Sequence, residues 1–300
     1  MRLSRKVNAR GHVPISPRPE LVYLDRVRAL EAAFSGRLGF HTMRLDDGAQ
    51  LSLRPDDRFP TASVIKIALV CALLDLVARG DVDLDETIEL PPRELRTPGG
   101  GVLKQLDVDR LSLRDLVELT ICLSDNVATN AVLERCGGEG PVNAYLGGIG
   151  LSATRLLGRV DFARITHDLD GGIGVATPRE QTELLARIAR DEILEPPLCA
   201  YLRGVLARQH FTDQVPRWLG WNTYAQYHGR DWPIWVANKT GELDGIRADA
   251  ALVRAGGRTL ALAIFTDGGH DRRETVDCEG ALAVAECGAA ICAELLDLDC

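Results

Sequence analysis

Apolar residues recur at helical spacing in six parts of the chain. The pattern predicts helices over residues 21–34, 63–79, 111–134, 180–190, 198–209 and 282–296. Local signals support three of their ends. Ser112 stands where a helix cap belongs, Thr177-Pro178 combines a cap with a first-turn proline, and Gly80 follows the second helix. The stretch 111–134 is long enough to hold two helices in succession.

Apolar and polar residues alternate near the two ends of the chain, which is typical of strands. Residues 37–53 predict a β-hairpin with its turn at 46–48, and residues 235–237, 246–254 and 260–265 predict three further strands. The two ends therefore build one α/β layer, into which the helical middle is inserted. We expect an N-terminal arm over 1–20, a discontinuous α/β sheet domain over 21–60 and 213–300, and a helical domain over 61–212.

Charge and composition argue against several classes of function. Three hundred residues can bury a large core, but the formal net charge of −8 does not suit a nucleic-acid or anionic membrane partner. No run of eighteen apolar residues predicts a membrane span. The basic residues of the arm are followed by no apolar stretch, so we expect a cytoplasmic protein. An extracytoplasmic location stays open if a leader has been trimmed.

The eight cysteines and six histidines do not form a metal motif. No two cysteines stand in a CxxC pair with a histidine at ligand spacing, so neither a metal nor another cofactor is expected. The cysteines lie mostly in apolar segments and are interpreted as reduced thiols. The run Gly99-Gly100-Gly101 lacks a following lysine and a preceding strand. It is therefore interpreted as a loop rather than a phosphate cradle.

Three short motifs carry the candidate chemistry: Ser-Val-Ile-Lys at 63–66, Ser-Asp-Asn at 124–126 and Lys-Thr-Gly at 239–241. A serine hydroxyl is a poor nucleophile until a base removes its proton. Ser63 and Lys66 lie three residues apart, so on a helix both side chains emerge on one face. Lys66 can act as the base only if burial and a second cation, for which Lys239 is the candidate, lower its pKa. The helix that begins at Ser63 also directs backbone N–H groups toward a developing oxyanion.

In these motifs, in their order and over nearly its whole length, the sequence resembles the class A serine β-lactamases and the wider superfamily of penicillin-recognising serine hydrolases. Residues 57–60, the longer pattern 124–130 and residues 245–247 agree as well. The resemblance implies a β-lactamase-like α/β fold. That fold has an antiparallel sheet flanked by terminal helices, an inserted all-helical domain with an Ω-type loop at about 155–177, and an active site between the two.

The resemblance also implies a role for each matching residue. Ser63 would be acylated, Lys66 would take its proton, and Ser124 would pass a proton to the leaving nitrogen. The backbone N–H groups of Ser63 and Glu242 would form the oxyanion hole. The other substrate contacts would be Asn126 with a substrate amide, and Lys239, Thr240 and Arg247 with a substrate carboxylate beside Gly241.

One position departs from the family pattern. The family places a glutamate on the Ω-type loop, followed four residues on by an asparagine, to activate the water that hydrolyses the acyl-enzyme. Here Asp161 and Ile165 stand at these places. Aspartate is one methylene shorter, and such a displacement of a catalytic group can cost on the order of 100-fold. Asp161 is either a weak base or a structural partner of an arginine in the loop. We therefore expect intact acylation and weak deacylation by water.

Aromatic residues concentrate in the segment 211–235, which holds all four tryptophans of the chain. Three interpretations stay open: an apolar cover for the core, a wall or lid on the cleft, and a subunit contact. His210 and His228 are interpreted as surface residues. The pattern does not predict an oligomeric state.

The leading hypothesis is a serine acyl-enzyme hydrolase that acts on an amide, β-lactam or ester bond of a small molecule. The first alternative is an acyltransferase, in which an amine or alcohol resolves the same Ser63 acyl-enzyme. The second is a penicillin-binding-type sensor that is acylated once without turnover. A glutaminase-like amidase fits less well, because that branch usually carries a tyrosine-containing motif in place of Ser124-Asp125-Asn126.

Overall fold

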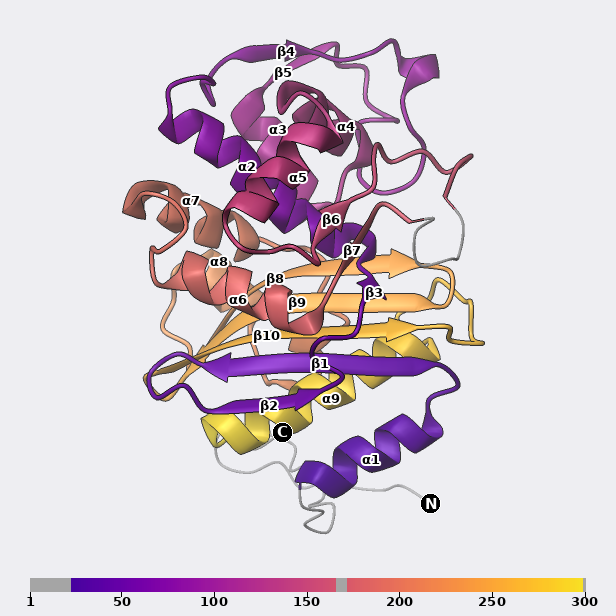
Figure 1. Ribbon diagram of the computed structural model, residues 1–300, viewed down its shortest axis with the longest axis vertical. Helices are drawn as coiled ribbons and strands as arrows, with labels where there is room; N and C mark the ends of the chain where they lie inside the picture. Colours follow the sequence, from indigo (N-terminus) through magenta and orange to yellow (C-terminus); the bar gives the residue numbers. More distant parts are fainter. Residues whose placement is uncertain (1–22, 166–171, 299–300) are drawn as a thin grey trace.

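A five-stranded antiparallel sheet with the order β2-β1-β10-β9-β8 forms the centre of the computed structural model (Figure 1). The structure describes residues 23–165 and 172–298, so the predicted arm over 1–20 and residues 166–171 of the predicted Ω-type loop lie outside it. The predicted hairpin and late strands are confirmed, although β8 and β10 are longer than expected. The strands of this sheet are β1 (Arg37–Arg44), β2 (Gln50–Leu53), β8 (Ile234–Leu243), β9 (Ile246–Ala255) and β10 (Arg258–Asp267).

Both faces of the sheet are buried, since side chains alternate between the faces along each strand and each face is covered. On β9, Ala250 and Leu252 pack with the helical middle of the chain, whereas Ala251 and Val253 pack with α9 (Glu279–Leu296). Helix α1 (Tyr23–Ala33) contacts α9 on that same side (Figure 1). The terminal helices therefore flank one face of the sheet.

The middle of the chain forms a helical layer over the other face (Figure 1). Helix α2 lies at its centre, and the stretch from Lys66 to Leu74 is buried throughout, as expected of a helix that is apolar all round. The division into a sheet domain and a helical domain stays a prediction. The helices of this layer are α2 (Lys66–Ala78), α3 (Leu113–Cys122), α4 (Asn126–Arg135), α5 (Glu139–Gly148), α6 (Pro178–Ala189) and α7 (Pro196–Leu206).

Local capping signals are confirmed where the sequence carries them. Ser112 Oγ accepts a hydrogen bond from the N–H of Asp115 at 3.1 Å, and Thr177 Oγ1 accepts from that of Glu180 at 3.2 Å. The stretch 111–134 is two helices, α3 and α4, separated by residues 123–125. That break decides the geometry of the candidate site.

Short elements complete the fold, and α5 and several of these elements have no clear signal in the apolar pattern. They are β3 (Phe59–Pro60), β4 (Thr87–Glu89), β5 (Arg110–Ser112), β6 (Arg155–Leu156), β7 (Gly174–Ala176), the 3₁₀ helices η1 (Ala62–Ile65), η2 (Arg93–Leu95) and η3 (Val215–Trp218), and α8 (Thr223–Tyr227).

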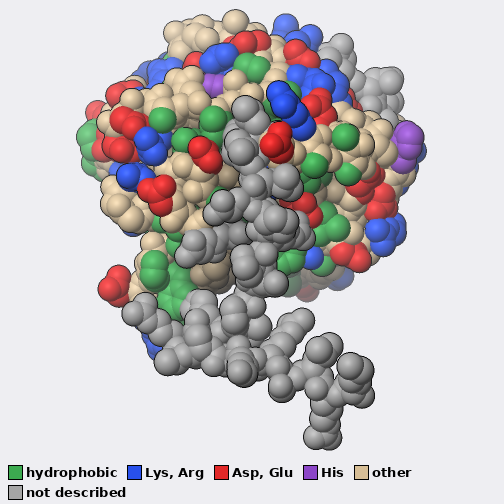
Figure 2. Space-filling view, turned by 90° about the horizontal axis from the view of Figure 1, so that it is seen from below, with side chains coloured by type: hydrophobic (Ala, Val, Ile, Leu, Met, Phe, Trp, Pro, Cys, Tyr) green, Lys and Arg blue, Asp and Glu red, His purple; other side chains and the backbone are tan. Residues whose placement is uncertain are grey.

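The surface seen from below carries basic and acidic side chains interspersed with each other (Figure 2). A mixed distribution of this kind is typical of a solvent-exposed protein surface. In the part of the chain that the structure describes, no helix combines the length and apolar character needed to cross a bilayer.

Candidate active site

Ser63 lies in η1, at the junction between β3 and α2. The preceding Ala62 has a φ of 43°, in the left-handed region that residues with a Cβ rarely occupy. The turn is held by Thr61, whose N–H donates to the carbonyl of Gly174 at 2.9 Å and whose carbonyl accepts from the N–H of Val64 at 3.1 Å. Ala62 and Val64 are buried, but Ser63 is only half-buried. The turn therefore leaves the Ser63 side chain accessible, whereas the hydroxyl-bearing Thr61 is buried.

Lys66, in the first turn of α2, is fully buried. Its Nζ donates to the carbonyl and the Oγ of Ser124 at 2.7 and 3.1 Å and to Oδ1 of Asn126 at 3.0 Å. Burial, and then the nearby charge of Lys239, lower the pKa of Lys66 well below its usual range, while the Asp125 carboxylate opposes them. An amine that loses its proton readily is suited to act as a base.

Lys239 is the second fully buried lysine of the site. Its Nζ donates to the carbonyl of Thr240, which is also buried, at 2.7 Å. Burial lowers the pKa of Lys239 to about 7, although the Asp249 carboxylate opposes this. Lysine can lose its proton at such a site, whereas arginine cannot. Lysine is rare in this sequence, and two of its four lysines, Lys66 and Lys239, belong to this site. The chain has 35 basic residues, of which the lysines are Lys6, Lys66, Lys104 and Lys239.

Ser124 occupies the break between α3 and α4, with a φ of 54°. Asp125, fully buried, holds this break through four backbone N–H groups. Its Oδ1 caps α4 by accepting from two N–H groups of the first turn, each at 2.9 Å. Its Oδ2 accepts from the N–H groups of Val102 and Leu103 at 2.7 and 2.8 Å. The middle residue of the Ser-Asp-Asn motif thus ties the Ser124 turn to a segment more than twenty residues earlier.

The glycine run 99–101 forms part of the wall of this site, which the sequence alone did not predict. A Cβ on Gly101 would lie 2.2 Å from Oδ2 of Asp125, and one on Gly100 would lie 2.8 Å from the carbonyl of Ser124. Both glycines have positive φ. The backbone can approach the Ser124 turn this closely only because these Cβ atoms are missing.

Strand β8 brings the Lys-Thr-Gly motif against the Ser63 turn. A Cβ on Gly241 would lie 2.5 Å from the carbonyl of Thr61 and 3.1 Å from the N–H nitrogen of Ser63. Glu242 faces Arg247 across the β8–β9 ladder and pairs with its guanidinium at 2.8 Å. The same guanidinium donates to three backbone carbonyl groups at 2.7 to 2.8 Å. Arg247 is therefore engaged with the protein itself.

Asp161 is half-buried, and its Oδ1 accepts from the N–H of Ala163 at 3.1 Å. Asn130 of α4 holds the chain just before it. Asn130 Oδ1 accepts from the N–H of Val160 at 2.9 Å, and its Nδ2 donates to the carbonyl of Val160 at 3.0 Å and to Oγ1 of Thr97 at 2.9 Å. The loop that carries Asp161 is thus fastened to the same helix as Asn126.

The aromatic segment 211–235 divides into packed and exposed parts. Trp235 packs with the core on the helical side and Trp221 with the core on the α9 side. The side-chain amide of Gln226 in α8 donates from Nε2 to the carbonyl of Val236 at 2.6 Å and accepts at Oε1 from its N–H at 2.9 Å. Because a strand rises about 3.3 Å per residue, α8 is anchored roughly 10 Å before Lys239 along β8. Exposed aromatic residues are Phe211, Trp218, Tyr224, Tyr227 and Trp232.

An apolar cover therefore accounts for the two packed tryptophans, Trp221 and Trp235. The lid and subunit-contact interpretations stay open for the exposed aromatic side chains. His210 and His228 are exposed, as predicted.

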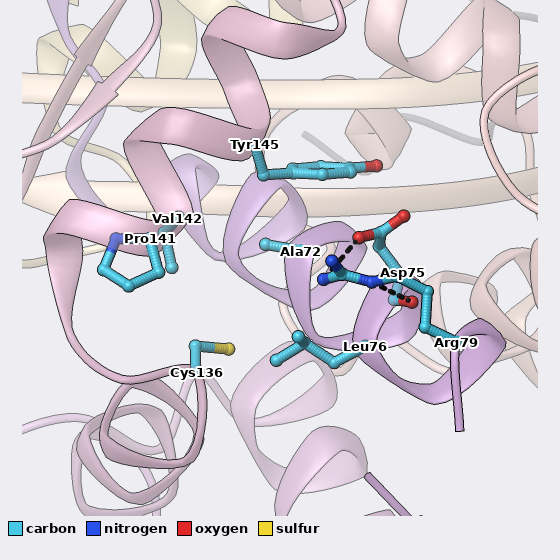
Figure 3. Close-up of a pocket in the computed structure, with 8 residues that line it drawn as sticks. All are labelled: Ala72, Asp75, Leu76, Arg79, Cys136, Pro141, Val142 and Tyr145. Carbon is cyan, nitrogen blue, oxygen red and sulfur yellow. Dashed lines mark hydrogen bonds and ion pairs between the residues drawn. The ribbon is translucent and has the colours of Figure 1, made fainter. Parts of the chain in front are cut away.

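A small cavity of about 40 Å³ lies between α2 and α5, toward the end of α2 away from Lys66 (Figure 3). Asp75 and Arg79 form an ion pair at 2.9 Å beside it. The hydroxyl of Tyr145 at this cavity is buried without a partner among the described residues. A single ordered water fits a polar space of this size. No residue of the three motifs lines the cavity, so it is separate from the candidate chemistry.

Comparison with known proteins agrees with this geometry. Residues 24–295 match the profile of the Beta-lactamase enzyme family. A beta-lactamase from Sphaerobacter thermophilus DSM 20745 is 26% identical, with a TM-score of 0.78 over 91% of this chain and 96% of that one. PBP-A is 24% identical, with a TM-score of 0.77 over 94% and 98% of the two chains. An ancestral (GNCA) class A beta-lactamase is 23% identical, with a TM-score of 0.78 over 91% and 100%.

The last two comparisons bear on the fold alone, and they confirm the predicted arrangement of an antiparallel sheet with flanking helices. The family match extends over almost the whole chain. It agrees with the three motifs and with the meeting of Lys66, Ser124 and the Ser63 turn in one place. The chain therefore belongs to the beta-lactamase enzyme family, as a divergent serine hydrolase of that superfamily.

Proposed function

We propose that this protein forms an acyl-enzyme on Ser63 and acts on an amide, β-lactam or ester bond of a small molecule. The observation that carries this proposal is the environment of Lys66. Its fully buried Nζ lies 3.1 Å from Ser124 Oγ, one helical turn from Ser63 and near a second buried lysine. Burying two lysines together costs free energy. Such an arrangement therefore favours a chemical role over a stabilising one.

Acylation uses the side chains in order. Neutral Lys66 takes the proton of Ser63 Oγ as this oxygen attacks the substrate carbonyl carbon. The backbone N–H groups of Ser63 and Glu242 stabilise the oxyanion. When the bond from the carbonyl carbon to the leaving nitrogen or oxygen breaks, Ser124 Oγ gives its proton to the leaving atom. Ser124 regains a proton from the Lys66 ammonium across their 3.1 Å contact, so Lys66 ends neutral again.

Substrate binding rests on the residues around the cleft. Asn126 meets a substrate amide, and Lys239 and Thr240 hold a carboxylate beside Gly241. Because the pKa of Lys239 is about 7, its attraction for a carboxylate weakens as the pH rises through that value. Arg247 contributes directly only if its guanidinium releases Glu242 or one of the carbonyl groups that now accept from it.

Deacylation is the weaker half of the proposed reaction. The side chain of Asp161 is shorter than a glutamate, and its carboxylate accepts a hydrogen bond from the N–H of Ala163. This observation favours a second candidate, an acyltransferase in which an amine or alcohol replaces water. A sensor that stays acylated is the limiting case. Asp161→Glu lengthens the side chain that carries the carboxylate by one methylene and should shorten the lifetime of the acyl adduct. An unchanged lifetime in Asp161→Glu and Asp161→Ala would assign Asp161 a structural role only.

The test of the proposed function is intact-protein mass spectrometry over time with a reporter penicillin. We expect the mass of one ligand to be added to the wild type and not to Ser63→Ala. A lasting adduct supports weak deacylation, and its faster loss on addition of amines supports the acyltransferase. An adduct that forms equally in Ser63→Ala would refute Ser63 as the nucleophile.

A further inference from the structure

The end of α3 is capped by a distant segment of the chain. The last carbonyl groups of a helix have no partner within the helix. Here the carbonyl of Ile121 accepts from Nε2 of Gln209 at 3.0 Å, and that of Cys122 accepts from the N–H of His210 at 3.1 Å. Two residues later the chain reaches Ser124. The segment that follows α7 therefore fixes the end of the helix that leads into the Ser-Asp-Asn motif.

The same amide also reaches the strand that carries the Lys-Thr-Gly motif. The Nε2 of Gln209 donates to the carbonyl of Asn238, the residue before Lys239, at 3.4 Å. Its Oε1 accepts from the N–H of Phe211 at 3.0 Å, which fixes the plane of the amide. The side chain is 2% exposed. One buried side chain thus contacts the backbone of both elements that flank Lys66.

We propose that Gln209 is a positioning residue that sets the separation between the Ser124 turn and Lys239. It touches neither the proposed nucleophile nor the proposed base. Its effect is indirect, because Lys66 is bonded to Ser124 on one side and repelled by Lys239 on the other. An effect of Gln209 on catalysis rests on the proposed function, whereas its effect on the separation between the Ser124 turn and Lys239 does not.

Few charged or titratable groups face the two lysines. Lys66 is influenced by Lys239 from β8 and by Asp125 from the start of α4. Lys239 is influenced by Asp249 from β9 and Cys122 from the end of α3. If the two elements separate, repulsion between the ammonium groups falls and water enters. Both changes favour the charged form of Lys66, so its pKa rises.

Gln181 provides a matched control. It is a fully buried glutamine on α6, and its amide donates to Oγ1 of Thr154 at 3.3 Å, far in sequence from all three motifs. Its replacement by methionine removes a buried side-chain amide, as the replacement of Gln209 by methionine does. Gln181→Met should therefore leave the separation between Ser124 and Lys239 unchanged.

The experiment is an NMR titration of lysine side chains labelled with ¹³C at Cε, in the full chain without substrate. With four lysines in the sequence, the variants Lys6→Arg and Lys104→Arg assign the signals of the two lysines that belong to none of the three motifs, and Lys239→Arg tells the signal of Lys239 from that of Lys66. We expect Gln209→Met to raise the titration midpoint of Lys66 by roughly 0.5 to 1 pH unit, a fraction of the shift that a neighbouring charge commonly produces. Gln181→Met should leave that midpoint unchanged.

An unchanged midpoint in Gln209→Met would overturn the proposal, and so would an equal shift in Gln181→Met. If Gln209→Met does not fold by circular dichroism, Gln209→Asn, whose amide is one methylene short, is judged by the same criteria. Because the titration needs no substrate, its result is separate from that of the penicillin experiment. Failure of the wild type to form an adduct would exclude the penicillin as a substrate of Ser63 and leave the role of Gln209 decided by the titration.

Discussion

Replacement of Gly241 by alanine tests how closely β8 lies against the nucleophile turn. The added Cβ would stand 2.5 Å from the carbonyl oxygen of Thr61, about 0.9 Å inside ordinary van der Waals contact at 3.4 Å. It would also stand 3.1 Å from the nitrogen of Ser63 and from the Cβ of Ala62. All three atoms belong to the turn itself, so no flexible side chain can move away. The strand and the turn must therefore separate by roughly 1 Å.

A displacement of that size has two measurable effects. Overpacking a buried contact costs about 1–3 kcal/mol of unfolding free energy, and a 1 Å misplacement of reacting groups can cost on the order of 100-fold in rate. We expect Gly241→Ala to lower the urea midpoint and to slow adduct formation with a reporter penicillin by about that factor. Gly148→Ala, where an added Cβ meets nothing within 4 Å, is the control. Wild-type acylation and stability in Gly241→Ala would refute the close packing of β8 on this turn.

Three further outcomes are expected. Asn130→Ala removes three hydrogen bonds, to Val160 and Thr97, and should lower the unfolding free energy by roughly 2–4 kcal/mol. Amide exchange at Val160 should accelerate, and unchanged protection there would contradict the role of Asn130 in holding this loop. Burial raises the pKa of Asp249 to about 7, so the folded wild type retains a proton that the unfolded chain releases, and its unfolding free energy should fall as the pH rises from about 4 to 7. Asp249→Asn should lose this dependence in urea titrations, and an equal slope would show that another group causes it. Gly204→Ala places a Cβ 3.5 Å from a flexible arginine side chain within α7 and should raise stability by about 0.5–1 kcal/mol; a lower melting temperature would contradict the open space at this position.

Local sequence determined the elements whose signals lie within a few residues. The caps at Ser112 and Thr177 form because each side chain reaches an N–H three residues on. The apolar character of residues 246–254 predicted β9, and the strand is buried on both faces of the sheet. Ser63 and Lys66 share one side of a helical turn by spacing alone. The sequence also indicated the family, because the three motifs retain their order.

Only the tertiary structure decided how these motifs meet. The break at Ser124 is stabilised by Asp125, which binds backbone N–H groups more than twenty residues away. The glycines at 100 and 101 belong to the site because a Cβ on either would collide with that break. Gln209 caps α3 across 88 residues of sequence. Such contacts depend on the space and the unpaired backbone groups that distant segments offer to each other, and no short sequence pattern contains that information. The same holds for the lowered pKa of Lys66, because burial and the nearness of Lys239 exist only after the chain has folded.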